Sequence, residues 1–419
     1  VAVASVHCGT GSDPGVRLAA VEVVGRLAHF ADEVAIASVA PALGDRSKAV
    51  RRAAATALGR LAPKSDERIV DAVLTRFRKF VAKPIPEAGF GAEVGEALAQ
   101  LTERRDGATL SIFLDAVGDT HDFVRRASVE VLGHIGSGDD EGVAGALTTA
   151  AKDQLVEVAQ AAVMALARVA NAGDERMVDL VCDCLSHRDS WMRRSAAEAL
   201  GTLALRGDAR AVSALSARCA DDPDPEVVQQ AIAALGRVAE RGDAVATAAL
   251  STAAGHRDER SRCAAAEALA LVATEDDAAA AAVLLEGLRD DDDEVVRLAA
   301  VALGEVGPRG DPRTISCLCD CLTASGGKVR QAAGAALAAV AGHGNAAAMA
   351  AVRRILEPLN GRMLPLSVRV DAVRTYGLIA PPGDEQAFCA LYACLRDHSA
   401  LLRRAAIEAL EVVGARSRV

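Results

Sequence analysis

This sequence has few aromatic residues and no long hydrophobic run. Only 2% of its 419 residues are aromatic, although 51% are hydrophobic. Aromatic side chains ordinarily supply much of the buried area of a large core. A core built instead from Ala, Val and Leu implies helices that approach one another closely. The longest uninterrupted apolar run, Ala278 to Leu285, is far too short to cross a bilayer, so we expect no membrane span.

The chain also lacks the features of several functional classes. Its formal charge of -10 argues against a general nucleic-acid binder, because phosphate contacts need a concentrated basic surface. There is no basic, apolar leader at the N-terminus. Ten cysteines without a paired pattern favour an intracellular, reducing compartment, with the cytoplasm preferred.

Catalytic and metal-binding motifs are missing as well. No phosphate loop, His-Glu pair or Ser/His/Asp set stands out. The cluster Cys317, Cys319 and Cys321 resembles a metal site, but on a helix Cys319 points away from the other two. Cys394 and several other cysteines recur at one helical position, which we interpret as a small buried slot. We therefore expect no enzyme activity, no cofactor and no metal.

What the sequence contains is a repeat. The stretch "VRRAAATALGRLA" has equivalents along the whole chain, usually 34 residues apart. We number the repeats 1 to 12 by one anchor residue in each: Gly25, Gly59, Ala99, Gly133, Ala167, Gly201, Gly236, Ala270, Gly304, Ala338, Gly377 and Glu411. Such self-similarity is typical of a solenoid, in which each repeat packs only on its neighbours.

Each repeat is predicted to hold two helices. Apolar residues around the anchor follow the spacing of an amphipathic helix, and the small anchor residue suggests a crowded contact. A second helix precedes it and begins at an Asp or Asn that serves as N-cap. The three Arg-Gly-Asp tripeptides, at 206–208, 241–243 and 309–311, fall at this start. We interpret Gly as the end of the preceding helix, Asp as the cap of the next, and Arg as a last-turn cation, rather than as adhesion motifs.

The two-helix unit resembles the HEAT repeat, especially the short variety found in phycobilin-lyase-like proteins. The resemblance is clearest at "AVRRAAATALGRLA", "FVRRASVEVLGHIG", "WMRRSAAEALGTLA" and "LLRRAAIEALEVVG". It implies an all-α fold, a right-handed α-solenoid (alpha-alpha superhelix) of about twelve HEAT-like repeats in one continuous array over 1–419. The first repeat is truncated, so we expect further repeats before Val1 and none after Val419.

The family also carries an Asp in the turn between the two helices and an Arg six residues later, which form a ladder between neighbours. Asp119 and Arg125 match this spacing. Repeats 5, 7 and 9 keep the Asp but lose the Arg, so we expect a broken ladder there. The acidic run Asp290 to Glu294 is interpreted as a solvated turn, with weak calcium binding or a basic partner as the alternative.

Two repeats are longer than the others, and both insertions lie between the two helices of a repeat. They fall near 80–90 and 356–367. Insertions in repeat arrays map to loops, where exposed apolar residues suit a partner. The candidate protein-binding residues are Phe80, Lys83, Ile85, Phe90, Arg362, Met363 and Leu364, together with Trp191 at the start of a helix in repeat 6.

Two functional hypotheses follow from the resemblance. The first is a non-enzymatic scaffold or adaptor, a structural subunit of a larger assembly, whose partners are one or more proteins. The alternative is an enzyme or chaperone subunit like the bilin lyases, holding a chromophore or an apoprotein. Nothing in the repeat identifies the partner.

Overall fold

The computed structural model describes residues 13–64, 66, 69–75, 90–102, 107–275, 277–358 and 362–416. Within these ranges the secondary structure is helical, and the chain divides into two compact units, Val1–Ala204 and Leu205–Val419. The boundary falls between repeats 6 and 7. Whether the two units continue as one array stays a prediction.

Unit 1 contains repeats 1 to 6. Its helices are α2 (Pro14–Leu27), α3 (Glu33–Val39), the 3-10 helix η1 (Ala40–Gly44), α4 (Lys48–Leu61), α6 (Phe90–Leu101), α7 (Gly107–Ala116), α8 (Asp122–Ile135), α9 (Glu141–Ala150), α10 (Val156–Val169), α11 (Glu175–Cys184) and α12 (Ser190–Leu203).

Unit 2 contains repeats 7 to 12. Its helices are α13 (Ala209–Asp221), α14 (Pro225–Val238), α15 (Ala244–Ala253), α16 (Glu259–Val272), α17 (Ala278–Gly287), α18 (Asp293–Val306), α19 (Pro312–Cys321), α20 (Gly327–Ala341), α21 (Ala346–Leu356), α22 (Leu366–Ile379), α23 (Glu385–Cys394) and α24 (Ala400–Arg416).

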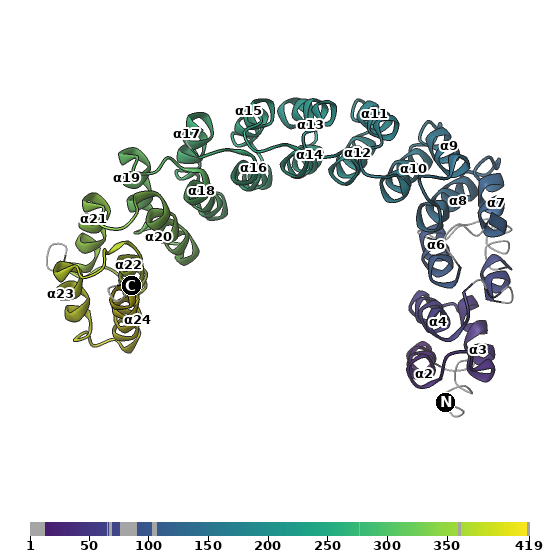
Figure 1. Cartoon of the computed structure of the whole chain (residues 1–419), viewed down its shortest axis with the longest axis horizontal. Coiled ribbons are helices and arrows are strands. Elements are labelled where there is room, and N and C mark those ends of the chain that lie inside the picture. The colour runs from purple at the N-terminus through teal and green to yellow at the C-terminus, as the bar shows by residue number, and fades with distance from the viewer. Residues whose placement is uncertain are drawn as a thin grey trace. The chain divides into compact units, whose positions relative to one another are not determined.

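The helices pack in sequential pairs, which confirms the predicted α-solenoid. In unit 2 the second helices α14, α16, α18, α20, α22 and α24 form one layer, and the first helices form the other (Figure 1). The core between the layers consists mainly of buried Ala, Val and Leu, as the composition predicts. The second insertion lies between α21 and α22, the two helices of repeat 11, as expected.

The anchor glycines lie where consecutive second helices touch. A methyl group on Gly133 would be 2.7 Å from the Cβ atom of Ala165, and one on Gly377 would be 2.8 Å from that of Ala409. Real Cβ atoms essentially never approach so closely. The prediction of a crowded contact is confirmed at these repeats.

The Asp residues at the starts of the first helices act as N-caps. Asp243 Oδ1 accepts hydrogen bonds from the amides of Val245 and Ala246, both at 2.9 Å. Asp208 accepts one from Ala211, and Asn345 accepts from Ala347 and Ala348. These side chains satisfy amides that the helix itself leaves free.

Two details of the Arg-Gly-Asp interpretation are wrong. The helix before Gly242 ends at Val238, several residues earlier, so the glycine does not terminate it. Gly242 has φ +89° and donates its amide to the carbonyl of Val272, at the end of the second helix of the next repeat. Arg241 lies outside the preceding helix and donates to the carbonyl of Ala273 at 3.0 Å. The guanidinium of Arg241 therefore lies at the C-terminus of the second helix of the following repeat, where the helix dipole favours a positive charge.

The ladder is present and runs between neighbouring repeats. Arg125 of repeat 4 pairs with Asp153 of repeat 5 at 2.8 Å, and Arg369 of repeat 11 pairs with Asp397 of repeat 12 at 2.7 Å. It is interrupted after repeats 5, 7 and 9, where the arginine is replaced. The replacing residues are Ala159, Val228 and Val296.

The crowded contact predicts opposite effects of the same substitution at two glycines. Gly377→Ala should lower the free energy of unfolding by about 1–3 kcal/mol, because the new methyl group forces two helices apart. Gly145→Ala, in the exposed interior of α9 with no atom within 4 Å, should raise it by about 0.5–1 kcal/mol. Urea denaturation followed by circular dichroism measures both, and equal effects would contradict the contact.

The capping role predicts that Asp243→Ala lowers local stability by about 1 kcal/mol, through loss of the bonds to the first turn of α15. Asp243→Asn is the control and should retain most of the stability. Hydrogen exchange of the α15 amides measures the effect. Adhesion of the intact chain to a receptor for Arg-Gly-Asp peptides would oppose the structural interpretation.

Candidate functional site

The predicted site residues fall into three places. Phe80, Lys83 and Ile85 lie outside the described residues, and Phe90 begins α6 with its side chain outside them. Trp191 lies in unit 1. Arg362, Met363 and Leu364 lie together in unit 2, between α21 and α22.

A groove of about 600 Å³ opens beside the second insertion. Its walls come from the end of α21, the insertion, α22, α23 and the start of α24. The residues that line it are Arg353, Leu356, Glu357, Met363, Arg369, Glu385, Gln386, Cys389, Ala390, Ala393, Cys394, Asp397 and Leu402. Of the three candidates at the insertion, the structure places Met363 in the groove, while Arg362 and Leu364 are not among the lining residues.

The insertion changes how repeat 11 is joined to repeat 10. Met363 occupies the turn position, fourteen residues before the anchor, where Asp153 and Asp397 stand in their repeats. Arg330 of repeat 10 pairs instead with Asp371, on α22, at 2.8 Å. The ladder carboxylate has thus moved from the turn into the helix, and the turn position is left to an apolar side chain that is 46% exposed.

Sulfur and small aliphatic groups form the apolar part of the groove. Met363 comes from the insertion, and Cys389 and Cys394 come from α23. Cys389 is exposed and Cys394 is half-buried, so the predicted buried slot is not closed at Cys394, although it is confirmed for Cys219 and Cys321 at the equivalent position. Burial raises the pKa of the Cys394 thiol, with a further contribution from Asp397. Polarisable, adaptable side chains of this kind accept apolar groups of varied shape.

The rim of the groove is polar and mostly paired. Arg353 donates to the Gln386 side chain at 3.0 Å and lies 4.0 Å from Glu357. Arg369 holds Asp397 at 2.7 Å. The Ser399 amide, followed by Arg369, lowers the pKa of Asp397, so this carboxylate stays ionised at neutral pH. Glu385 is exposed, and no ion pair to it is found among the described residues.

The chemistry of the groove lining is that of a binding surface. Its lining residues include no histidine that could activate a cysteine, and the Cys394 pKa is shifted away from the thiolate. A concave, largely apolar site with a few polar groups suits an apolar side chain.

Trp191 forms a separate candidate site in unit 1. Asp189 caps α12 by accepting hydrogen bonds from the backbone amides of Trp191 and Met192, which places Trp191 in the first turn of the helix. The Trp191 side chain is 60% exposed. The guanidinium of Arg194 lies 5.4 Å from the ring centroid, within range of a cation–π contact that holds the ring outward.

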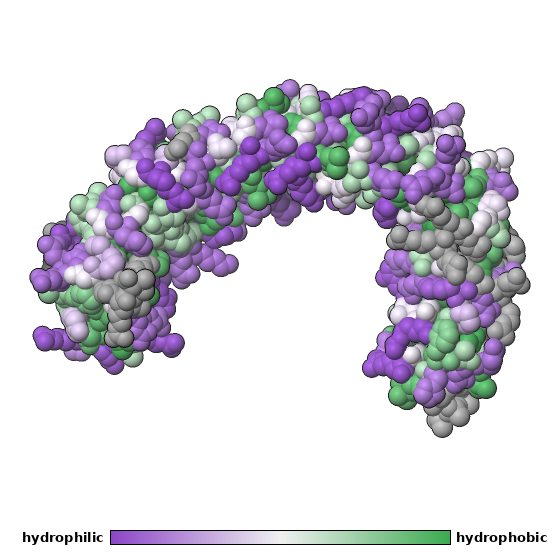
Figure 2. Space-filling view, in the orientation of Figure 1, coloured by the Kyte–Doolittle hydropathy of each residue, from purple (hydrophilic) through white to green (hydrophobic). Residues whose placement is uncertain are grey.

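The hollows found in unit 1 have a different character. One, of about 770 Å³ between α2 and α4, is lined mainly by charged and small residues, including Glu22, Arg26 and Arg60. Another, of about 250 Å³ between α4 and α6, contains the ion pair of Arg52 and Glu96. The visible face of unit 2 is likewise largely hydrophilic, with smaller hydrophobic areas between (Figure 2).

Sequence reasoning missed most of the groove. Leu356 lies on α21, Gln386 and Cys389 on α23, and Leu402 on α24, and these residues carry no shared motif. The signal that was available is the loss of the turn Asp at Met363, combined with the insertion.

No helix of the described chain is long and apolar enough to cross a membrane.

The acidic run at 290–294 is also more structured than predicted. The side chain of Asp290 is 12% exposed and pairs with Arg262 at 2.7 Å. Asp292 caps α18 through the amides of Glu294 and Val295. The interpretation as a solvated turn is wrong for these two residues.

Comparison with known proteins supports the repeat assignment. A family model described as HEAT repeats matches residues 9–80, 144–236, 220–304 and 280–338, more than half of the chain. No protein with a curated function matches the sequence.

Solved structures share the fold at low sequence identity. A crystal structure of a Kap121p mutant is 12% identical with a TM-score of 0.62, over 99% of this chain and 49% of that one. Kap121p bound to Pho4p gives the same identity, TM-score and coverage. Kap95p, from a structure concerning its binding to RanGDP, is 11% identical with a TM-score of 0.64, over 99% of this chain and 62% of that one.

The chain therefore spans about half to three fifths of the length of these solenoids. The specific similarity to phycobilin lyases finds no support in the comparisons. From the repeated helix pairs, the crowded anchors and the family match together, the chain belongs to the HEAT-repeat family.

Proposed function

We propose that this chain is a non-enzymatic, protein-binding scaffold and that the groove beside the second insertion holds a segment of a partner protein. HEAT-repeat solenoids generally bind proteins, and the structures of Kap121p with Pho4p and of Kap95p with RanGDP are consistent with this role. The observation that carries the proposal is Met363, which is exposed at a position where repeats 5, 9 and 12 place a paired aspartate.

The chemistry of the groove suggests the kind of segment. Leu356, Met363 and Cys389 would contact an aliphatic or methionine side chain. Glu385, exposed at the start of α23, would pair with a lysine or arginine next to it. The chain's net charge of -10 favours a basic partner in the same way. We therefore propose an apolar residue flanked by a basic one as the recognised feature.

Trp191 is proposed as a second contact point. An exposed, oriented tryptophan is a common anchor in protein interfaces. Because it lies in unit 1 and the groove lies in unit 2, the two sites can be tested independently.

Selection of peptides from a displayed library on the purified chain tests the groove. We expect enrichment of sequences with an aliphatic or Met residue beside Lys or Arg. Met363→Glu should weaken their binding by about tenfold, because a charge replaces an apolar contact at the pocket wall. Trp191→Ala should leave the binding of these peptides unchanged.

Charge exchange provides the control for the basic residue. Glu385→Lys should weaken the binding of a Lys-containing peptide by about twofold to fivefold, as expected for the loss of an exposed ion pair. The same peptide with Glu in place of Lys should bind this variant with the original affinity. A peptide that binds the Met363→Glu and Glu385→Lys variants as well as it binds the unaltered chain would exclude the groove as its site. Replacing 357–365 by a short Gly-Asn turn should remove binding while circular dichroism stays unchanged.

Cysteine labelling gives an independent footprint. Cys389 is exposed and should react with a maleimide in the native chain, whereas Cys219 is 2% exposed with its pKa raised to about 12 and should not. A selected peptide should protect Cys389. Mass spectrometry of the digested chain measures both, and unprotected Cys389 at saturating peptide would contradict the proposal.

A further inference from the structure

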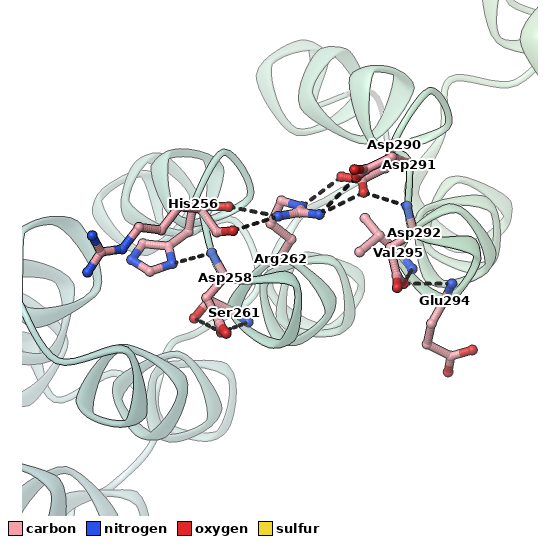
Figure 3. Close-up of polar contacts among 10 residues, drawn as sticks. His256, Asp258, Ser261, Arg262, Asp290, Asp291, Asp292, Glu294 and Val295 are labelled. Carbon is pink, nitrogen blue, oxygen red and sulfur yellow. Dashed lines mark hydrogen bonds and ion pairs between the residues drawn. The ribbon is translucent and has the colours of Figure 1, made fainter.

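The ladder ion pairs join two turns at once. Arg262, on α16 of repeat 8, donates from Nε and Nη2 to the two carboxylate oxygens of Asp290 in repeat 9, at 2.7 and 2.8 Å (Figure 3). Its Nη1 atom donates to the carbonyls of His256 and Arg257, in the turn of its own repeat. Asp290 also accepts from the amide of Asp292. One guanidinium therefore ties the turn of repeat 8 to the turn of repeat 9.

The same arrangement recurs, largely out of solvent. Arg330 binds Asp371 of the next repeat and the carbonyls of Ala324 and Ser325 in its own turn. The side chains of this pair are 5% and 6% exposed, and those of Arg262 and Asp290 are 15% and 12% exposed. Buried charge pairs of good geometry impose a defined register more than they add stability. Each pair, which we call a rung, thus fixes the angle between two repeats.

In the middle of the chain the residues needed for a rung alternate along the sequence. Repeats 4, 6, 8 and 10 carry the arginine, and repeats 5, 7 and 9 carry the turn aspartate without it. The arginines are Arg125, Arg193, Arg262 and Arg330, and the aspartates are Asp153, Asp222 and Asp290. At the joints after repeats 7 and 9 both partners are missing. Val228 stands at the arginine position of repeat 7, and His256 stands at the aspartate position of repeat 8. Val296 and Ala324 stand at the corresponding positions of repeats 9 and 10. The joints after repeats 7 and 9 cannot form the rung.

These two joints are still held at the opposite edge of the array, where the loops between repeats lie. The loop between repeats 7 and 8 is fixed by the amide of Gly242 on Val272, and the loop between repeats 9 and 10 by that of Gly310 on Val340. The covalent connection runs through the same edge. At the turn edge of the joint after repeat 7, Gln229 donates a single-pronged hydrogen bond to Asp258 at 2.9 Å, and the two-pronged ion pair of a rung cannot form there.

We propose that the joints between repeats 7 and 8 and between repeats 9 and 10 are hinges, which open at the turn edge about the fixed loop edge. Unit 2 then consists of repeat 7, a rigid pair of repeats 8 and 9, and a rigid block of repeats 10 to 12. The rigid block carries the groove, so its walls keep their geometry while the hinges adjust the curvature of unit 2. This inference stands apart from the proposed function.

Hydrogen exchange of the full chain measures turn opening directly. Protection factors at 288–292, the turn that receives a rung from the preceding repeat, should exceed those at 322–326, the turn that receives none from repeat 9, by about tenfold. The double variant Val296→Arg with Ala324→Asp places a rung after repeat 9, because Val296 occupies on α18 the position of Arg262 on α16. We expect it to slow exchange at 322–326 by about tenfold.

The reversed variant, Val296→Asp with Ala324→Arg, is the matched control, since it has the same composition without the rung geometry. Equal exchange in the forward and reversed variants, or equal protection of the two native turns, would overturn the hinges. Arg262→Gln decides the matter if either double variant fails to fold. It should raise exchange at 288–292 to the level of 322–326, and no change there would also overturn the proposal.

Discussion

The contact between consecutive second helices is the constraint on which the rest of the structure depends. At Gly133 against Ala165, and at Gly377 against Ala409, the backbones approach so closely that a methyl group does not fit. This distance explains why the chain has so few aromatic residues, because large rings find no space between such helices. It also makes the stability of the array sensitive to the addition of a single methyl group at the anchor positions.

A core of Ala, Val and Leu holds the helices together but discriminates weakly between neighbouring packing angles, since small side chains interdigitate little. The polar groups at the two edges supply that discrimination. At one edge, left-handed glycines such as Gly242 and Gly310 tie their connecting loops to the end of the second helix of the next repeat. At the other edge, guanidinium groups tie adjacent turns. The edges are unequal, because backbone bonds need no particular side chain, whereas a rung needs two.

Repeat 11 shows how an insertion creates a groove without disturbing the packing of the helices. Its helix α22 keeps the register of the other second helices, and Arg369 makes the ordinary pair with Asp397. The carboxylate that Arg330 requires is supplied by Asp371 on the helix itself. Because Asp371 supplies this carboxylate, the turn position does not need an aspartate. Met363 occupies the turn position and forms part of the wall of the groove.

The sequence by itself determined the features that depend on residues within one helix or one turn. The 34-residue period, the two-helix repeat, the caps at Asp208 and Asp243, the crowded glycines and the lost arginines of repeats 5, 7 and 9 can all be derived from local spacing. The tertiary structure decided which residues of neighbouring repeats meet. It moved the partner of Arg241 to the following repeat, replaced the turn carboxylate by Asp371 and brought Cys389 to Met363. Such contacts depend on the angle between repeats, which is set by packing across a whole interface and leaves no periodic trace in the sequence.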